Sequence, residues 1–436
     1  MKKIILAATA LAGFAAPAMA GDMMLGTDSF ASGLASGAAL APGDITVRMR
    51  AQMWVEGSYV TDTFQKTSTG KNSGVLMDSY VRLYPKFDAK TAGGLQYGAQ
   101  LEIRMNSGTG AGSSGSNTLY AKRYVAYLGT DSLGRLYLGP ELNAIGRVTG
   151  GFTMEDFDYN GGFNGDIPYA TSNASPGNSA LLNWVSGKGS GFYSTNKIVY
   201  VTPSFSGVTM AVAYEPSQSS GESSLASGGT LNPTTSSYNG SSNLRRNTVD
   251  FGVRWAGSVG PLAVAVGGGY ITAGRVIDTN KADVPYRNLS FGDVGTRVTY
   301  GPFAVGGNVN FGAIDGNSGG TMLRQGQRNG VNAIFGAQYI IGPVIMGFQY
   351  VVNTSGGNYN QTTAANSLHE YGIMVGGGYD FAPGATLYGD VFYDQRHQYG
   401  WNFLTGAGNT GTTVKTLSVN NRIQARGFQI GTAFKW

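Results

Sequence analysis

The sequence contains no cysteine and only two histidines, His369 and His397. The lack of cysteine excludes disulfide bonds and thiolate metal sites. Two histidines leave little room for imidazole catalysis or a zinc centre, because both need further groups held close by. We therefore expect no cofactor, no metal and no catalytic residue.

Charge is also scarce, at 13% of residues against about 25% in a typical soluble domain. The 30 basic and 25 acidic residues give a small positive balance, and no dense basic run accompanies it. Such a charge balance is not typical of a nucleic-acid-binding protein, which carries clustered basic residues. We therefore expect no nucleic-acid partner.

Long hydrophobic runs are missing as well. After residue 20, no stretch of eighteen or more uncharged apolar residues could form a transmembrane helix. Yet aromatic residues reach 11% and glycine numbers 69. Within lipid, only helices and closed barrels satisfy every backbone polar group, so this composition favours a transmembrane β-barrel.

The first twenty residues have the pattern of a secretory signal peptide. Lys2 and Lys3 precede an apolar stretch at 4–14, and Ala-Met-Ala at 18–20 is a typical cleavage site. We expect residues 1–20 to direct export across a bacterial inner membrane. Residues 21–44 then form an N-terminal lead-in whose structure the sequence does not predict, ahead of a barrel at 45–436.

Alternation of period two begins at residue 45. In ITVRMRAQMWVEGSY (45–59) the odd positions are mainly apolar and the even positions mainly polar, a separation that a helix of period 3.6 would not produce. The same alternation of apolar and polar residues recurs along the rest of the chain. Sixteen strands are predicted at about 45–59, 78–88, 95–106, 119–130, 133–139, 196–202, 208–215, 247–255, 262–271, 288–300, 303–311, 329–340, 343–352, 369–381, 385–396 and 422–436.

The predicted fold class is all-β, a transmembrane antiparallel barrel, because an even strand count closes such a sheet. Seven short turns alternate with eight long loops, as periplasmic turns and extracellular loops do. Taken alone, the Ser- and Gly-rich segment 216–246 could also be a linker between domains. A soluble β-sandwich would show alternation too, but a water-filled lumen accounts better for the charges on the polar face.

Three stretches resemble Gram-negative general diffusion porins. NKIVYVTPSFSGVTMAVAYEP (196–216) resembles the hairpin that follows the constriction loop of trimeric porins, and LGRLYLGPE (133–141) resembles the short strand that leads into that loop. FQIGTAFKW (428–436) resembles the sorting signal read by the outer-membrane barrel assembly machinery, with a final Trp where Phe is usual. The signal residues would be Phe428, Ile430, Phe434 and Trp436.

The resemblance implies a barrel of the cell outer membrane that crosses it many times and assembles as a homotrimer. Its surroundings would be outer-membrane lipid and lipopolysaccharide. Ions and small hydrophilic solutes would pass through it by passive diffusion.

In this family the third long loop folds inward and narrows the channel, and 140–195 is the longest connection here. Its middle, TMEDFDYNGGFNGDIPY, carries acids with no base between them. Lining of the constriction is one interpretation and a plain solvated loop is another, whereas the regular oxygen spacing of a calcium loop is missing. The acids are Glu155, Asp156, Asp158 and Asp166.

Arginines on the first strands are expected to face that loop from the wall. Guanidinium groups stay charged beside one another, and strands about 4.8 Å apart bring them into one patch. The competing interpretation is local pairing with inward acids such as Glu56 or Glu102. Parity places Arg48, Arg50, Arg82 and Arg104 in the lumen, and Arg123 and Arg135 extend the set.

Six wall arginines against four loop acids predict a weak preference for anions. A channel specific for phosphate or a sugar is the main alternative, with Trp54, Tyr80 and Tyr84 as a short inward aromatic track. A barrel enzyme is a third possibility, although no nucleophile and base are evident together. An adhesin without a conducting pore is the fourth.

Overall fold

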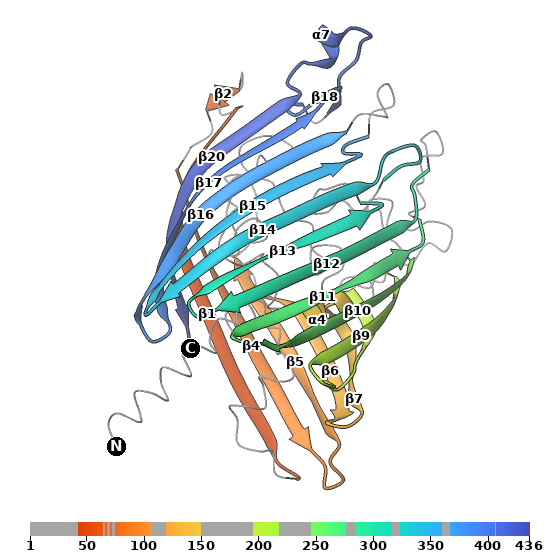
Figure 1. Cartoon of the computed structure of the whole chain (residues 1–436), viewed down its shortest axis with the longest axis vertical. Coiled ribbons are helices and arrows are strands. Elements are labelled where there is room, and N and C mark those ends of the chain that lie inside the picture. The colour runs from red at the N-terminus through yellow and green to blue at the C-terminus, as the bar shows by residue number, and fades with distance from the viewer. Residues whose placement is uncertain are drawn as a thin grey trace.

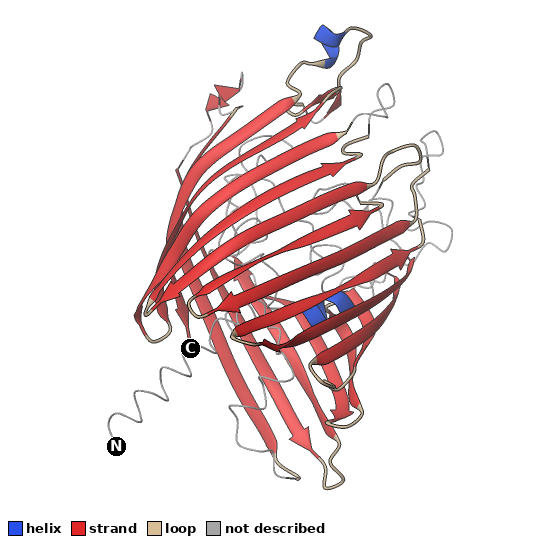
Figure 2. Cartoon of the chain, in the orientation of Figure 1, coloured by secondary structure: helices blue, strands red, loops and turns tan. Residues whose placement is uncertain are grey.

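The computed structural model describes residues 42–63, 66–67, 70–71, 75–106, 119–149, 195–217, 246–275, 285–314, 323–359, 367–405 and 407–436. Sixteen strands form one closed antiparallel barrel (Figures 1 and 2). All sixteen predicted strands are confirmed, with ends that differ by a few residues. Two small two-stranded sheets, β2–β3 and β18–β19, lie outside the barrel order.

The barrel strands follow the chain around the ring. They are β1 (Ile45–Asp62), β4 (Val75–Lys90), β5 (Gln96–Asn106), β6 (Tyr120–Thr130), β7 (Gly134–Glu141), β8 (Thr195–Val201), β9 (Val208–Ser217), β10 (Arg246–Val259), β11 (Leu262–Ala273), β12 (Leu289–Tyr300), β13 (Phe303–Gly312), β14 (Gly330–Ile341), β15 (Val344–Ser355), β16 (Leu368–Ala382), β17 (Ala385–Gln398) and β20 (Arg422–Lys435). The small sheets are β2 (Lys66–Thr67), β3 (Gly70–Lys71), β18 (Trp401–Asn402) and β19 (Ala407–Gly408).

The short turns all lie at one end of the barrel and depend on glycine. Gly301, Gly342 and Gly384 join consecutive strands in two-residue turns, with φ values of 54°, 55° and 73°. Side chains larger than hydrogen rarely adopt these positive φ values. The YGP, IGP and APG stretches therefore supply the tight reversals that antiparallel neighbours need.

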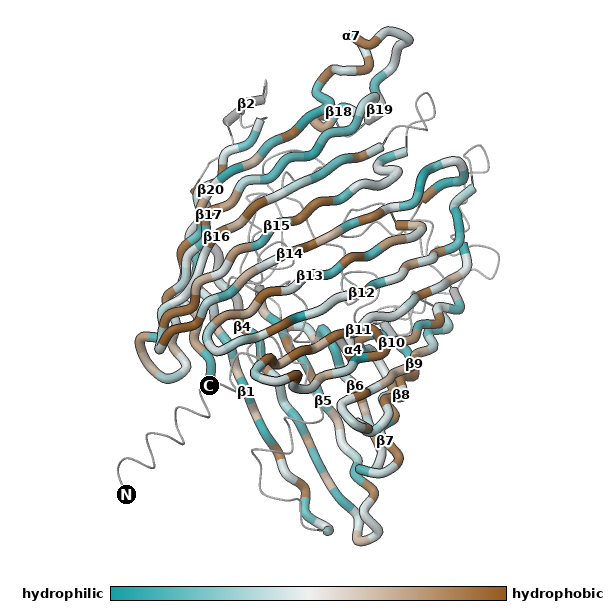
Figure 3. The backbone as a smooth tube through the Cα atoms, in the orientation of Figure 1, coloured by the Kyte–Doolittle hydropathy of each residue, from teal (hydrophilic) through white to brown (hydrophobic). Residues whose placement is uncertain are grey.

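The two faces of the sheet differ in polarity along every strand (Figure 3). On β20, Ile430 is 53% exposed, whereas the adjacent Gln429 is 3% exposed. Exposed apolar side chains at every second position form the outer surface, and polar ones face the lumen. This is the alternation that a barrel in lipid requires.

Two short helices belong to the long connections. Helix α4 (Ala144–Thr149) follows β7 and lies inside the barrel against β8–β11, and helix α7 (Val414–Leu417) lies between β17 and β20 (Figure 2). Within the described ranges, no helix is both long enough and apolar enough to cross a membrane.

The ring closes where the last strand meets the first. Tyr59 pairs with Phe428, and their rings lie 6.1 Å apart. The N–H of Trp436 donates to the carbonyl of Ala51 at 3.1 Å, and the N–H of Ala51 donates to the carbonyl of Trp436 at 2.8 Å. The final aromatic residue is therefore fixed in the sheet by both backbone groups.

Gly431 lies on the inner face of this seam, between β1 and β17. Tyr388 donates a hydrogen bond to Glu56 Oε2 at 2.6 Å across it. A Cβ on Gly431 would lie 2.5 Å from Tyr388 Oη and 2.9 Å from Glu56 Cβ. Only glycine leaves room for this pair to cross the seam.

We expect Gly431→Ala to displace Tyr388 and to lower the free energy of unfolding by about 1–3 kcal/mol, as overpacking does in dense interiors. Urea unfolding in lipid vesicles, followed by tryptophan fluorescence, measures the change. Gly389→Ala on the neighbouring strand is the matched control, because its Cβ would meet only Gln429 O, at 3.2 Å. Equal unfolding midpoints for the two variants would contradict the prediction.

Candidate functional site

The predicted basic wall lies on the inner face of β1 and β4–β7. The strand register places Arg82 directly opposite Arg104 and places Arg48 opposite Lys86. Directly opposed residues on antiparallel strands have Cβ atoms about 4.5–5.5 Å apart. The structure therefore brings together basic side chains that are separated by more than twenty residues in the chain.

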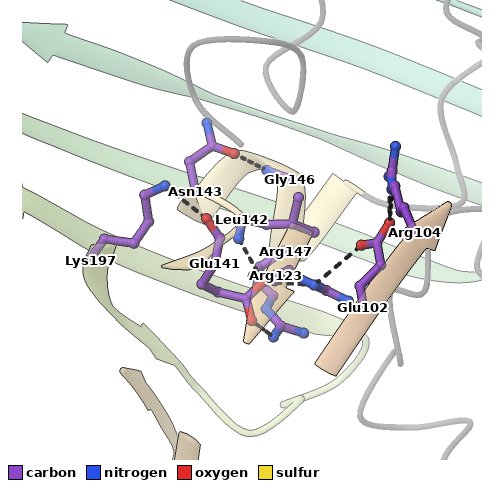
Figure 4. Close-up of polar contacts among 9 residues, drawn as sticks. All are labelled: Glu102, Arg104, Arg123, Glu141, Leu142, Asn143, Gly146, Arg147 and Lys197. Carbon is purple, nitrogen blue, oxygen red and sulfur yellow. Dashed lines mark hydrogen bonds and ion pairs between the residues drawn. The ribbon is translucent and has the colours of Figure 1, made fainter. Parts of the chain in front are cut away.

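The centre of this wall is a chain of alternating charges (Figure 4). Glu102 accepts a hydrogen bond from Arg104 Nε at 2.6 Å, and its other oxygen lies 3.7 Å from Arg123 Nε. Arg123 Nη1 donates to Glu141 Oε1 at 2.9 Å, and Arg147 pairs with the second oxygen of Glu141. Arg123 points inward as predicted, but it is 0% exposed, so it lies beneath the surface that a solute would touch.

Towards the turns, two further wall arginines contact local partners. Arg48 pairs with Asp88, which also lies 3.6 Å from Lys86 Nζ. Arg135 Nη2 donates to Gln96 Oε1 at 2.5 Å. The interpretation of local pairing thus applies to Arg48, and it applies equally to Arg104 and Arg123, which pair with Glu102 and Glu141. Arg135 is held by an amide instead.

The remaining two arginines differ in setting. The guanidinium of Arg82 lies 5.1 Å from the ring centre of Trp54, a distance at which a cation and an aromatic face attract. Arg50 is exposed. Trp54 and Tyr84 are only 1% and 4% exposed, so they do not form an accessible aromatic track; nothing is described of the Tyr80 side chain.

Helix α4 begins the third long loop, and the adjoining wall formed by β8–β11 fixes it in place. The carboxylate of Asp250 on β10 accepts hydrogen bonds from the N–H groups of Ala144 and Ile145, the latter at 3.3 Å. Lys197 Nζ on β8 donates to the carbonyl of Glu141 at 2.8 Å and lies 3.5 Å from Glu215. These buried contacts satisfy backbone groups that a helix terminus leaves without internal partners.

The inner wall is recessed where the helix packs. A Cβ on Gly252 would lie 2.6 Å from Val148, and one on Gly269 would lie 2.5 Å from Ile145. Sequence reasoning missed both glycines, together with Asp250 and Lys197. The sequence did contain a signal for this contact: two adjacent strands each carry a glycine at an inward position. Glycine in a strand often marks a place where another segment approaches closely.

The wall from β12 to β17 carries amides and carboxylates. Asn332 Nδ2 donates to Asn310 Oδ1 at 2.7 Å, and Arg396 Nε lies 2.7 Å from Glu370 Oε1. The polar side chains buried on this wall include Asp293, Asn308, Asn310, Asn332, Gln349, Asn353, Glu370, Asp390, Asp394 and Arg396. The lumen is therefore asymmetric in its balance of charge. Arginines and lysines together outnumber acids on β1–β7, whereas acids and amides outnumber Arg297 and Arg396 on β12–β17.

The four acids predicted to line the constriction lie outside the described residues. Glu155, Asp156, Asp158 and Asp166 all fall between residues 150 and 194. The predicted boundary of their loop, at residue 140, shifts by two positions because Pro140 and Glu141 still pair with β8.

A closed barrel with an apolar outer face and a charged lumen defines a transmembrane channel. The Gram-negative porin family matches residues 7–398, and the chain belongs to this family. It is therefore an outer-membrane, multi-pass β-barrel that forms a channel for passive diffusion.

Solved structures share the fold. An anion-selective porin from Comamonas acidovorans aligns over 90% of this chain and 100% of its own, with a TM-score of 0.55 and 15% identity. A mutant of the Rh. blastica porin aligns over the same shares, with a TM-score of 0.50 and 15% identity. No curated protein matches the sequence.

We expect Asp250→Ala to loosen helix α4, because the N–H groups of Ala144 and Ile145 lose a buried acceptor. Such a loss costs about 1–3 kcal/mol, which corresponds to roughly a fivefold or greater rise in amide exchange. Hydrogen–deuterium exchange of the segment 141–149 measures it.

Asn353→Ala is the control for that variant, since Asn353 is 1% exposed on β15, whereas the helix packs against β8–β11. Unchanged exchange at 141–149 in Asp250→Ala would show that another group holds the helix.

Proposed function

We propose that this porin conducts anions somewhat better than cations. The observation that carries the proposal is the pairing of Arg82 with Arg104 across β4 and β5, flanked by Arg48 and Arg50 on β1. Charge selectivity in channels comes from such patches on the pore wall. Glu102, Glu141 and Asp88 offset part of this charge, so the preference is weak.

The second part of the proposal concerns the third loop. Residues 140–195 narrow the lumen, and Glu155, Asp156, Asp158 and Asp166 oppose the wall arginines. The position of helix α4 inside the barrel supports this, because the loop enters the lumen at its first turn. Opposed charges would align dipolar solutes and water, and would disfavour apolar solutes.

Partners follow from the family and from the outer surface. The chain assembles as a homotrimer in contact with outer-membrane lipid and lipopolysaccharide. Phe428, Ile430, Phe434 and Trp436 serve as the signal for the barrel assembly machinery. Their exposure on the outer face, from 38% for Phe434 to 67% for Trp436, supports a role in recognition from outside the barrel.

The lumen favours passive diffusion over catalysis or sugar selection. The aromatic residues Trp54 and Tyr84 are covered, so they offer no track for a sugar ring. His369 and His397 oppose each other at outward positions of β16 and β17, outside the lumen. These positions support a channel without a substrate-specific or catalytic site.

We expect the double variant Arg82→Ala, Arg104→Ala to lower the anion-to-cation permeability ratio by about two- to fivefold. Two unit charges at about 8 Å in a water-filled pore contribute roughly 1 kcal/mol together. Reversal potentials across planar bilayers in asymmetric salt measure the ratio.

Gln52→Ala is the matched control, because Gln52 lies opposite Arg82 in the same row and carries no charge. A wild-type channel that prefers cations, or a double variant with an unchanged ratio, would refute the proposed selectivity. Liposome swelling with graded sugars would reveal a specific channel as a preference unrelated to size.

A further inference from the structure

Four basic side chains gather on the outer face of the barrel at its extracellular end. His369 on β16 opposes His397 on β17, and His397 opposes Arg422 on β20. Arg426 lies four residues further along β20, on the same face and opposite Tyr393. We call these four residues the outer basic patch.

The patch begins where the apolar surface ends. Along β20, the outward residues change from Phe434, Ile430 and Phe428 to Arg426, Gln424 and Arg422. Along β16, they change from apolar side chains to Tyr371 and then His369. The apolar part of β16 spans about ten residues, which matches an outward apolar band about 25 Å tall once strand tilt is included.

Aromatic rings mark the boundary beneath the patch. The rings of Tyr371 and Tyr393 lie 5.9 Å apart, and aromatic girdles occur at the level of lipid headgroups. The long connections 356–367 and 399–421 adjoin the patch, which places it on the extracellular side. The patch therefore lies at the headgroup level of the outer leaflet.

The positive charge of the patch comes from Arg422 and Arg426, because histidine is mostly neutral near pH 7. His369, Arg422 and Arg426 are exposed, and His397 is half-buried with Asn421 Nδ2 at 3.3 Å from its Nε2. No Asp or Glu occupies an outward position in the extracellular halves of β15, β16, β17 and β20. In the part of the chain that the structure describes, no ion pair is formed by Arg422 or Arg426.

Two exposed arginines above an aromatic row suit a lipid that carries phosphate on its headgroup. Guanidinium binds phosphate through paired N–H donors, and the aromatic and apolar residues below suit acyl chains. We propose that the outer basic patch binds the phosphorylated headgroup of lipopolysaccharide. The proposal rests on the outer-membrane location and on the general lipid contact proposed above, and it does not require conduction.

The patch suits a lipid better than a second copy of the chain. Two copies related by a twofold axis at this surface would bring the arginines of one against those of the other, which costs free energy unless acids intervene. Gln395 and Gln424 are joined by a 2.7 Å hydrogen bond beside the patch, and their amides add neutral donors suited to sugar hydroxyls. We therefore assign the surface to the glycolipid headgroup.

Native mass spectrometry of the purified full-length porin with diphosphorylated lipid A tests the proposal. A basic residue near an anionic lipid surface contributes about fivefold to binding. The variant Arg422→Ala, Arg426→Ala should therefore bind lipid A about 25-fold more weakly than wild type. Lys415→Ala on the exposed helix α7 removes one positive charge outside the patch; it is the control and should bind as wild type does.

Dephosphorylated lipid A should bind weakly to wild type and to the double variant alike. The proposal would be overturned if wild type and the double variant bound lipid A equally, or if wild type bound the dephosphorylated form as tightly as lipid A. Displacement of lipid A by millimolar inorganic phosphate would also overturn it. A change in oligomeric state in the double variant would assign the surface to a contact between copies instead. Heat-modifiable electrophoretic mobility shows whether each variant is folded. A wild-type protein that does not conduct would contradict the proposed channel function and would leave the lipid-binding proposal unaffected.

Discussion

Every backbone N–H and C=O group that lies in lipid must find a partner within the protein, and this requirement shapes the whole molecule. A sheet meets it only by closing on itself. The pairing of β1 with β20 achieves closure, down to the reciprocal bonds between Ala51 and Trp436. Closure then commits one side of each strand to lipid and the other to the lumen. The side chains that line the channel therefore come from every second residue of each strand.

The inner face combines two kinds of charge. Arg123, Glu141 and Arg147 are buried and satisfy one another, so they fix the start of the third loop to the wall. Removing one member of such a group leaves another charge buried without compensation, which is strongly destabilising. Arg50 is exposed and Arg48 retains 38% of its side-chain surface, so these two are available to a passing ion. Arg82 and Arg104 are more covered, so they act on a passing ion through the field of their charges rather than by direct contact.

Period-two alternation was sufficient to predict all sixteen strands, because lipid and water impose it on each one. The same parity predicted that Arg82 and Arg104 face inward, but only the register shows that they are opposed. The partners of buried charges, such as Glu141 for Arg123, depend on segments folded back across the lumen. Asp250 and Gly252 looked like ordinary strand residues, since the helix that they receive comes from a distant loop. Local patterns record which face a residue occupies and do not record what approaches that face.

The seam also sets the order of events during assembly. Thr61 bonds to the carbonyl of Arg426 although 365 positions separate them, so this contact cannot form until nearly the entire polypeptide has arrived. The loop that must be closed contains nearly the whole barrel, and contacts of this kind slow folding. Until then both β1 and β20 expose unpaired edges that invite association with other chains. A nascent chain is consequently vulnerable to association with other chains for as long as its final strand is missing.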